Sequence, residues 1–301
     1  MEPDRYHQPV LADRIVELFA PVPGGPVIDA TFGGGGHSRL LAEAGHEVIA
    51  FDRDPDVPPP VEGVRLVPRP FGEMADALDE LGVTEISGAF FDLGVSSHQL
   101  DTAERGFSYR HPGPIDMRMD RTSPLSADRI VNEWSAADIA DVIHRYSDER
   151  FARRIAEAIV RSRPIPDTAT LADVVREAIP AATRRTGGHP ARRTFQALRI
   201  AVNDELGELE RGLEVALDRL APGGRCAVIS YHSLEDRYTK RRFVDEATGC
   251  TCPPEQPVCT CGRVVTAKLV SRKPIRPDAD EVADNPRARS ALLRVLERVA
   301  A

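Results

Sequence analysis

Several features are scarce in this chain, and each absence excludes a class of protein. Aromatic residues make up 5% of its 301 residues, with one Trp, and no stretch approaches the roughly 18 uninterrupted apolar residues of a membrane helix. The first residues are polar and charged and lack the apolar segment of a secretory leader. We therefore expect a cytoplasmic protein with no membrane partner. The 42% hydrophobic and 29% charged residues are typical of a globular protein.

A basic excess is also missing, since the formal net charge is -8. Lys and Arg side chains that neutralise phosphates supply most non-specific affinity for nucleic acids, so any such binding would need local patches. Two segments rich in arginine, 184–199 and 237–242, are candidates. Taken alone, charge clusters of this kind are more often solvated helix faces.

Cysteine is nearly absent outside one short segment, which holds four of the five residues. This distribution excludes a secreted scaffold held by dispersed disulfides. The pairs Cys250-Thr-Cys252 and Cys259-Thr-Cys261 could place four sulfurs around one structural zinc ion. Two disulfides or free thiols are the alternatives, although a reducing cytoplasm favours the metal.

Strand-like and helix-like segments alternate in the first third of the chain. Residues 26–33, 46–52 and 85–97 contain short apolar runs. The segments between them include stretches whose apolar residues have the spacing of a helix. This alternation predicts an α/β fold with a doubly wound, mostly parallel sheet. The segment 192–220 is predicted to form one long amphipathic helix, followed by an apolar strand near 225–233. The segment 291–299 is as compatible with helix as with strand.

Strand signals vanish between residues 122 and 190, where helical patterns dominate. The chain therefore divides into a first part of the sheet domain at 1–121, a helical insertion for substrate recognition at 122–190, and a second part at 191–301. The cysteine-rich loop at 250–261 belongs to this last part.

An acid and four glycines follow the first predicted strand. The spacing from Asp29 to Gly33 and Gly35 is typical of methyltransferases, in which this loop packs on the methionine part of S-adenosylmethionine. A dinucleotide fingerprint would need glycine at Ser38. Asp52 ends the second strand and could accept hydrogen bonds from both ribose hydroxyls.

The fourth predicted strand ends at Asp92, at the edge where open α/β sheets bind ligands. In enzymes that methylate an exocyclic amine, an oxygen at this strand end accepts hydrogen bonds from that amine, so Asp92 is the predicted catalytic residue. Holding the reactants in line can supply much of the acceleration. Phe107, Tyr109 and Tyr231 are candidates to stack on the target base, although each could be a packing residue.

Seven blocks spread over nearly the whole chain resemble the RsmH or MraW family of ribosomal small-subunit RNA cytosine-N4 methyltransferases. The resemblance is more specific than a glycine loop, because several blocks have no structural reason to recur by chance. The blocks are HQPVL at His7, DATFGGGGHS at Asp29, AFDRDP at Ala50, DLGVSSHQLDTAERGFSYRHPGPIDMRMD at Asp92, HPARRTFQALRIAVNDEL at His189, ISYHSLEDR at Ile229 and NPRARS at Asn285.

This resemblance implies transfer of a methyl group from S-adenosylmethionine to N4 of a cytidine in the decoding region of 16S rRNA, within a small-subunit particle. It adds contacts to those expected from the residues themselves. The resemblance implies cofactor contacts at Gly35, Gly36, His37, Asp52, Phe71, Asp92 and Gln99. The glycine spacing adds Gly33 to this predicted set.

The substrate contacts are predicted from residue types suited to RNA, namely Arg for phosphates and aromatic or amide groups for a flipped base. Asp116 and Arg118 could be either an ion pair or substrate contacts. The competing role for Tyr231 and His232 is a hydrogen-bonded turn. The predicted set is Arg192, Arg193, Phe195, Gln196, Tyr231 and His232.

Three other functions are compatible with parts of the pattern. An NAD-dependent oxidoreductase would also use a glycine turn and Asp52, although the glycine spacing argues against it. A non-enzymatic RNA-binding factor would use the arginine and cysteine segments and would have no need of the intact glycine and acid positions. An amino methyltransferase acting on another nucleic acid is the third.

Overall fold

The structure is a computed structural model that describes residues 9–181, 189–250, 252, 253, 256, 258 and 260–300. It divides into two compact units. Unit 1 comprises Met1–Gly94 and Gly207–Ala301, and unit 2 comprises Val95–Leu206. None of the described helices is both long and apolar enough to cross a membrane.

Unit 1 is built on one sheet, whose described strands run in the order β3-β2-β1-β4-β5-β7-β6. The pairs from β3 to β5 are parallel, and β7 runs antiparallel to both β5 and β6. This confirms the predicted doubly wound, mostly parallel sheet, and it shows that the ambiguous segment near the C-terminus is a strand. The strands are β1 (Val27–Asp29), β2 (Val48–Phe51), β3 (Val64–Val67), β4 (Ile86–Asp92), β5 (Leu220–Ser230), β6 (Ala267–Leu269) and β7 (Leu292–Arg298).

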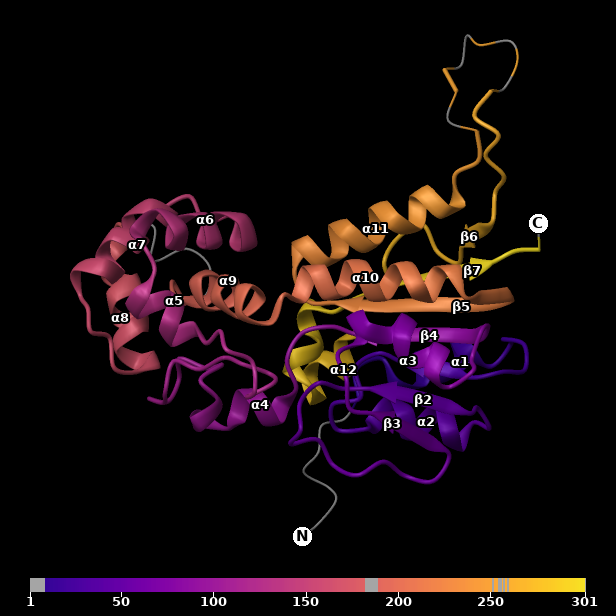
Figure 1. The fold of residues 1–301 in the computed structure, drawn as a ribbon, viewed down its shortest axis with the longest axis horizontal. Helices are drawn as coiled ribbons and strands as arrows, with labels where there is room; N and C mark the ends of the chain where they lie inside the picture. The colour runs from indigo at the N-terminus through magenta and orange to yellow at the C-terminus, as the bar shows by residue number, and fades with distance from the viewer. Residues whose placement is uncertain are drawn as a thin grey trace. The chain divides into compact units, whose positions relative to one another are not determined.

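Helices cover both faces of this sheet, which is why its central strands are apolar along their whole length. Ile28 and Phe91 face the layer that contains α3, α10 and α11, whereas Val27 and Phe90 face α1 and α2. Figure 1 shows α10 and α11 running along one side of β5. The helices of unit 1 are α1 (Ala12–Phe19), α2 (Gly36–Glu43), η2 (Phe71–Glu73), α3 (Met74–Glu80), α10 (Glu205–Asp218), α11 (Ser233–Ala247), α12 (Ala279–Asp284) and η4 (Pro286–Ser290), with the first two residues of α10 in unit 2.

Strand β1 is the point at which the sheet reverses its winding. It pairs with β2 on one side and with β4 on the other, and Asp29 lies opposite Ala50 and Phe90. In open α/β sheets, ligands bind outside the carboxyl ends of the strands at this position. The predicted residues that follow β1, β2 and β4 therefore share one edge of the sheet.

Unit 2 is helical and has its own apolar core. It begins at Val95 and ends at Leu206, whereas the sequence placed the insertion at 122–190. The difference arises because Phe107, Met117 and Leu198, outside the predicted range, are buried in that core. The helices are α4 (Ser97–Asp101), η3 (Ala103–Arg105), α5 (Ala127–Glu133), α6 (Ala136–Ser147), α7 (Ala152–Arg161), α8 (Thr168–Ala178) and α9 (Arg192–Asn203).

The prediction of one long helix over 192–220 is wrong, because the chain forms two helices there, α9 and α10. Asp204 separates them with a left-handed φ of 48° and ends α9. Asn203 stabilises this end by donating to the carbonyl oxygen of Met117 and accepting from the amide of Met119, at 2.7 and 2.8 Å. The amphipathic spacing continues across the break, which is why the sequence pattern did not reveal it.

The core of unit 1 provides a test of the packing. Leu213 on α10 is fully buried, so Leu213→Ala should lower the free energy of unfolding by about 2–5 kcal/mol through lost burial and a residual cavity. Val244 on α11 is 40% exposed, and Val244→Ala should change it by less than about 0.5 kcal/mol. Denaturant unfolding of both variants measures the difference. Equal effects would contradict the described packing.

Candidate active site at the carboxyl ends of the strands

Asp29 braces the turn that follows β1. Its carboxylate is fully buried and accepts hydrogen bonds from the Ser38 hydroxyl at 2.6 Å and the Thr31 amide at 3.1 Å. Burial raises the pKa of Asp29, although the hydrogen bond from Ser38 acts in the opposite direction. Asp29 therefore ties the turn to the first residues of α2 and is itself closed to solvent.

Two of the glycines in this turn are required by its shape. Gly33 and Gly35 have φ angles of 53° and 74°, which other residues adopt with strain. A Cβ atom on Gly35 would lie 2.8 Å from the ring of Phe32, and one on Gly36 would lie 2.6 Å from Pro9. Gly35 and Gly36 thus allow the chain to pack closely on itself as α2 begins.

His37 is buried on the first turn of α2 with its ring 4.6 Å from that of Phe90. Its Nε2 lies 2.9 Å from the carbonyl oxygen of Val10, which can only accept, so Nε2 carries the hydrogen. Burial lowers the pKa of His37, so the ring is neutral at neutral pH. Its Nδ1 then presents a lone pair, 3.7 Å from Oδ2 of Asp92.

Asp52 follows β2 and connects it to the glycine turn. One carboxylate oxygen accepts from the amide of Gly33 at 2.7 Å, and the other accepts from the amide of Asp54 at 2.8 Å. Each oxygen keeps a further lone pair for a donor such as a hydroxyl. Burial raises the pKa of Asp52, with the two amide bonds partly opposing it.

Phe71 begins the short helix η2 and meets Phe91 edge to face, with ring centroids 5.6 Å apart. Glu208 on α10 holds this segment by accepting from the Gly72 amide at 2.7 Å and pairing with Arg53 at 2.9 Å. A Cβ atom on Gly212 would lie 2.6 Å from the Phe71 ring. Contacts from α10 therefore fix the ring that is predicted to lie beside adenine.

Asp92 ends β4 and is held by residues from two neighbouring strands. Its amide donates to the Thr31 hydroxyl at 2.7 Å, and its Oδ1 accepts from the Tyr231 hydroxyl at 2.8 Å. The side chain is 23% exposed, so the carboxylate is mostly buried yet reachable. Burial raises the pKa of Asp92 to about 7, with Tyr231 opposing the rise and Glu235 adding to it.

Tyr231 and His232 follow β5 and form the start of α11. His232 is the N-cap residue, and Glu235 completes the capping box by accepting from the Tyr231 and His232 amides at 2.9 and 3.3 Å. Burial and the neighbouring Asp92 raise the pKa of Tyr231, so its hydroxyl keeps its proton. The turn therefore orients a neutral phenol toward Asp92.

The arrangement has clear relatives among known proteins. A family model described as the MraW methylase family matches residues 4–299. The chain belongs to this family. Proteins named ribosomal RNA small subunit methyltransferase H are 51% identical in Symbiobacterium thermophilum, 48% in Heliobacterium mobile and 49% in Geobacter sp. strain M21. Each comparison covers 98% of this chain and 98%, 99% and 99% of the relative, respectively.

Membership makes the chain an S-adenosylmethionine-dependent methyltransferase, and the chemistry at the strand ends fits that cofactor. Asp29, Asp52 and Asp92 all lie at this edge, and burial raises the pKa of each. A pyrophosphate would add negative charge beside these carboxyl groups, whereas a sulfonium would be attracted to their ionised forms. Ribose hydroxyls match the acceptor oxygens of Asp52. The site of this methylase thus suits a cationic nucleoside.

The remaining predicted contacts lie in unit 2. Gln99 is 5% exposed, and its side-chain oxygen accepts from the Ser96 amide at 3.0 Å in the capping box of α4. Phe195 is 4% exposed and lies edge to face with Tyr109, so it is a core residue and cannot stack on a base in this conformation. Arg192 and Arg193 are exposed on α9.

Gln196 and Arg193 also have local partners. The Gln196 amide donates to the carbonyl oxygen of Tyr146 at 3.3 Å, and Arg193 lies 3.4 Å from Glu149 with 60% of its side chain exposed. Arg184 and Arg185, from the same predicted basic segment, lie outside the described residues. Among the described arginines of this segment, Arg192 and Arg193 at the start of α9 are therefore the exposed ones.

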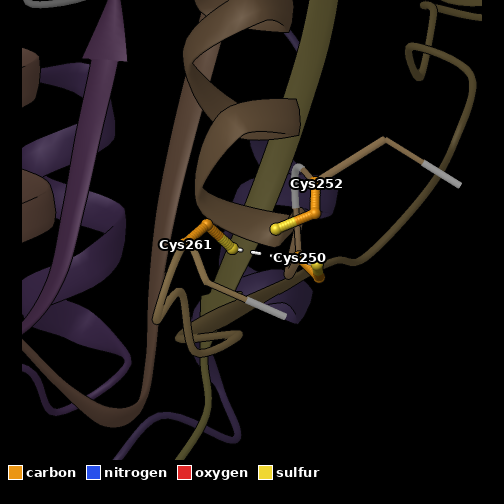
Figure 2. A group of neighbouring side chains, drawn as sticks. All are labelled: Cys250, Cys252 and Cys261. Atoms are coloured by element: carbon orange, nitrogen blue, oxygen red, sulfur yellow. Dashed lines mark hydrogen bonds between the residues drawn. The ribbon is translucent and has the colours of Figure 1, made fainter. Parts of the chain in front are cut away.

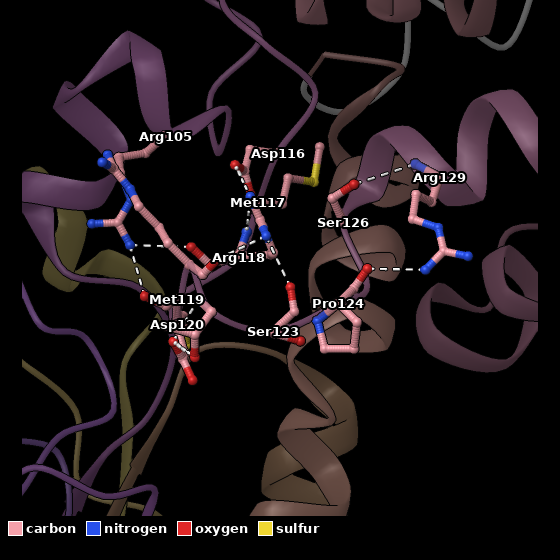
Figure 3. Close-up of polar contacts among 12 residues, drawn as sticks. Arg105, Asp116, Met117, Arg118, Met119, Asp120, Ser123, Pro124, Ser126 and Arg129 are labelled. Carbon is pink, nitrogen blue, oxygen red and sulfur yellow. Dashed lines mark hydrogen bonds and ion pairs between the residues drawn. The ribbon is translucent and has the colours of Figure 1, made fainter.

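Asp116 and Arg118, for which two roles were open, pair with each other. The guanidinium donates to both carboxylate oxygens at 2.7 and 2.9 Å and also to the carbonyl oxygen of Ser123 (Figure 3). Beside them, the buried Arg105 donates to the carbonyl oxygens of Arg118 and Met119 at 3.1 and 2.9 Å (Figure 3). These bonds organise the loop, which favours the structural role.

Sequence reasoning missed three contacts of the site. The Thr31 hydroxyl accepts from the backbone amide of Asp92 and so joins the glycine turn to β4. The Tyr231 hydroxyl donates to the carboxylate of Asp92, and the carbonyl oxygen of Val10 fixes the ring of His37. Thr31 belongs to the block DATFGGGGHS. Its position just after the first predicted strand, with a hydroxyl that can bond a neighbouring strand end, is the signal that could have identified it. The partnership of Tyr231 and Asp92 spans 139 residues and has no local signal.

The pKa of Asp92 predicts a pH-dependent cost to folding. Because the folded pKa of about 7 exceeds the ordinary 3.8, the unfolded chain loses this proton first, and stability falls as pH rises between these values. Asp92→Asn should therefore stabilise the protein, by at most about 4 kcal/mol above pH 7 and progressively less toward pH 5.

Melting temperatures measured between pH 5 and 8 provide the test. Glu214→Gln, on the exposed face of α10, is the matched control and should give no such trend. An increase in melting temperature from Asp92→Asn that does not change with pH would contradict the buried, proton-binding state of this carboxyl group.

Proposed function

We propose that this methylase transfers a methyl group to N4 of a cytidine in the decoding region of 16S rRNA, in the cytoplasm and within a small-subunit particle. The observation that carries the proposal is the carboxylate of Asp92, held at the tip of β4 beside the glycine turn. The names of the relatives, all small-subunit rRNA methyltransferases, support the substrate class. The resemblance described above supports the cytidine and its position.

The residues around β1 and β2 would hold the cofactor. Asp52 would accept hydrogen bonds from the ribose hydroxyls, and Phe71 would lie beside the adenine. The turn through Gly33, Gly35, Gly36 and His37 would pack on the methionine part. Gln99 is a further proposed contact, which rests on the family resemblance alone. When bound, S-adenosylmethionine supplies the methyl group as a sulfonium.

Asp92 would orient the target amine and take up its proton. The carboxylate oxygen not bonded to Tyr231 can accept a hydrogen bond from the exocyclic amine, which leaves the nitrogen lone pair directed away from Asp92. Methylation makes the nitrogen acidic, and a carboxylate with a pKa of about 7 can accept the released proton at neutral pH.

Exposed basic side chains on two helices would bind phosphates of the RNA. Arg192 and Arg193 on α9 are exposed and suited to phosphates. On α11, Arg237, Lys240 and Arg241 are exposed at helical spacing and form a second basic face. Tyr231 and His232 would contribute to the cytosine pocket through the turn that positions Asp92.

The arginines of α9 give a prediction that is independent of the chemistry. Arg192→Glu with Arg193→Glu should weaken binding to a small-subunit rRNA fragment. The slope of log K against log salt concentration should become shallower by about 0.7–0.9 for each lost phosphate contact. Titrations at several salt concentrations measure this slope. Arg145→Glu with Arg161→Glu, exposed on α6 and α7, is the control of equal charge and should have a smaller effect.

The decisive experiment is mass spectrometry of 16S rRNA from cells that lack this protein. We expect one methyl group on a decoding-region cytidine to disappear and to return with the wild-type gene. Asp92→Ala should restore none of it, and its rate in vitro should fall by about 100-fold or more. Normal modification in the deleted strain would refute the substrate assignment.

A calorimetric titration with S-adenosylmethionine separates the two levels of the proposal. Saturable binding of S-adenosylmethionine, together with unchanged methylation of 16S rRNA in the deleted strain, would support a methyltransferase that acts on another nucleic acid. The Arg192→Glu, Arg193→Glu variant should bind the cofactor normally, because its changes lie outside the residues that we assign to the cofactor.

A further inference from the structure

The described part of the segment between α11 and β6 has no apolar core of its own. Of its described residues from Thr248 to Thr266, none is buried, and Val258 and Val264 are 70% and 66% exposed. Figure 1 shows this part of unit 1 extending away from the sheet beyond the end of α11. A segment without a core needs a covalent link or a metal to take a defined shape.

Three thiols converge inside this segment. The sulfurs of Cys250, Cys252 and Cys261 all lie within 4.8 Å of one another, and the three side chains point together in Figure 2. The sulfur of Cys261 donates a hydrogen bond to that of Cys250 at 3.8 Å, and no disulfide joins them. Sulfurs bound at about 2.3 Å to one tetrahedral zinc ion would be separated by about 3.8 Å. The separation between Cys250 and Cys261 matches this value, and the other two pairs of sulfurs are at most 4.8 Å apart.

The backbone around the thiols supports this geometry. The amide of Thr260 donates to the sulfur of Cys252 at 3.4 Å, the type of bond that stabilises a metal-bound thiolate. Gly262 has a φ of 63°, so the chain turns directly after Cys261 in a conformation that a larger residue would strain. Both features fix the direction of the sulfurs without using apolar packing.

We propose that Cys250, Cys252 and Cys261 bind a zinc ion that closes this loop. The repeated Cys-Thr-Cys spacing predicts Cys259 as the fourth ligand, and that residue lies outside the described part of the chain. Zinc suits a tetrahedral site of thiolates, and a site with four protein ligands leaves no open position for a substrate. The ion is structural, and it is independent of the methyl acceptor.

Metal analysis of the full chain, purified under reducing conditions from zinc-supplied cells, tests the proposal. We expect about one zinc ion per chain, and a fall to background in Cys261→Ser and in Cys252→Ser. Cys226→Ser is the matched control, because Cys226 is buried in β5 and should leave the zinc content unchanged. Cofactor binding by calorimetry checks that the sheet of each variant remains folded.

A second readout does not depend on variants. Cobalt added to the chelator-treated wild-type protein should give the intense visible absorption of a tetrahedral thiolate site, and zinc should protect the loop from limited proteolysis. Several results would overturn the proposal: a zinc-free wild-type protein, iron in place of zinc, zinc retained in Cys261→Ser, or an intact mass showing these thiols joined in a disulfide.

Discussion

The polar edge of the sheet depends on the hydrogen bond between the Thr31 hydroxyl and the amide of Asp92. Thr31 belongs to the turn that Asp29 braces and that Gly33 links to Asp52, so this bond makes the ends of β1, β2 and β4 one connected structure. Because parallel neighbours end at the same edge, a short side chain can bridge them. A shift of the glycine turn would therefore be transmitted directly to the backbone of Asp92.

Burial of the acids at this edge costs stability in the free protein. Asp29, Asp52 and Asp92 all have raised pKa values because desolvation disfavours their ionised forms. Each keeps hydrogen-bond donors around it, so the site is organised before any ligand arrives. A cationic nucleoside would offset part of the cost by favouring the ionised carboxylates. The same groups that weaken the empty fold thus prepare it for the cofactor of a methylase.

Much of this could be predicted from the sequence, since it follows from strand patterns and strand ends. The apolar runs that became β1, β2, β4 and β5 are buried on both faces, and the acids that follow β2 and β4 share an edge because parallel strands end together. The failures involve information that the pattern does not carry. Asp204 breaks a helix whose amphipathic spacing continues, and Phe195 is as apolar as a base-stacking residue but lies in the core of unit 2.

Helix α11 relates the two polar sites of unit 1. It begins at the His232 cap, next to Tyr231 and Asp92, and it ends at Ala247, three residues before Cys250. Its 15 residues rise about 22 Å, so a metal at the far end cannot polarise a group at Asp92. A zinc ion there could influence methylation only through the shape of the loop that follows the helix. The helix itself carries the exposed Arg237, Lys240 and Arg241. The fold in this way separates the chemistry at one end of the helix from a surface suited to phosphates along it.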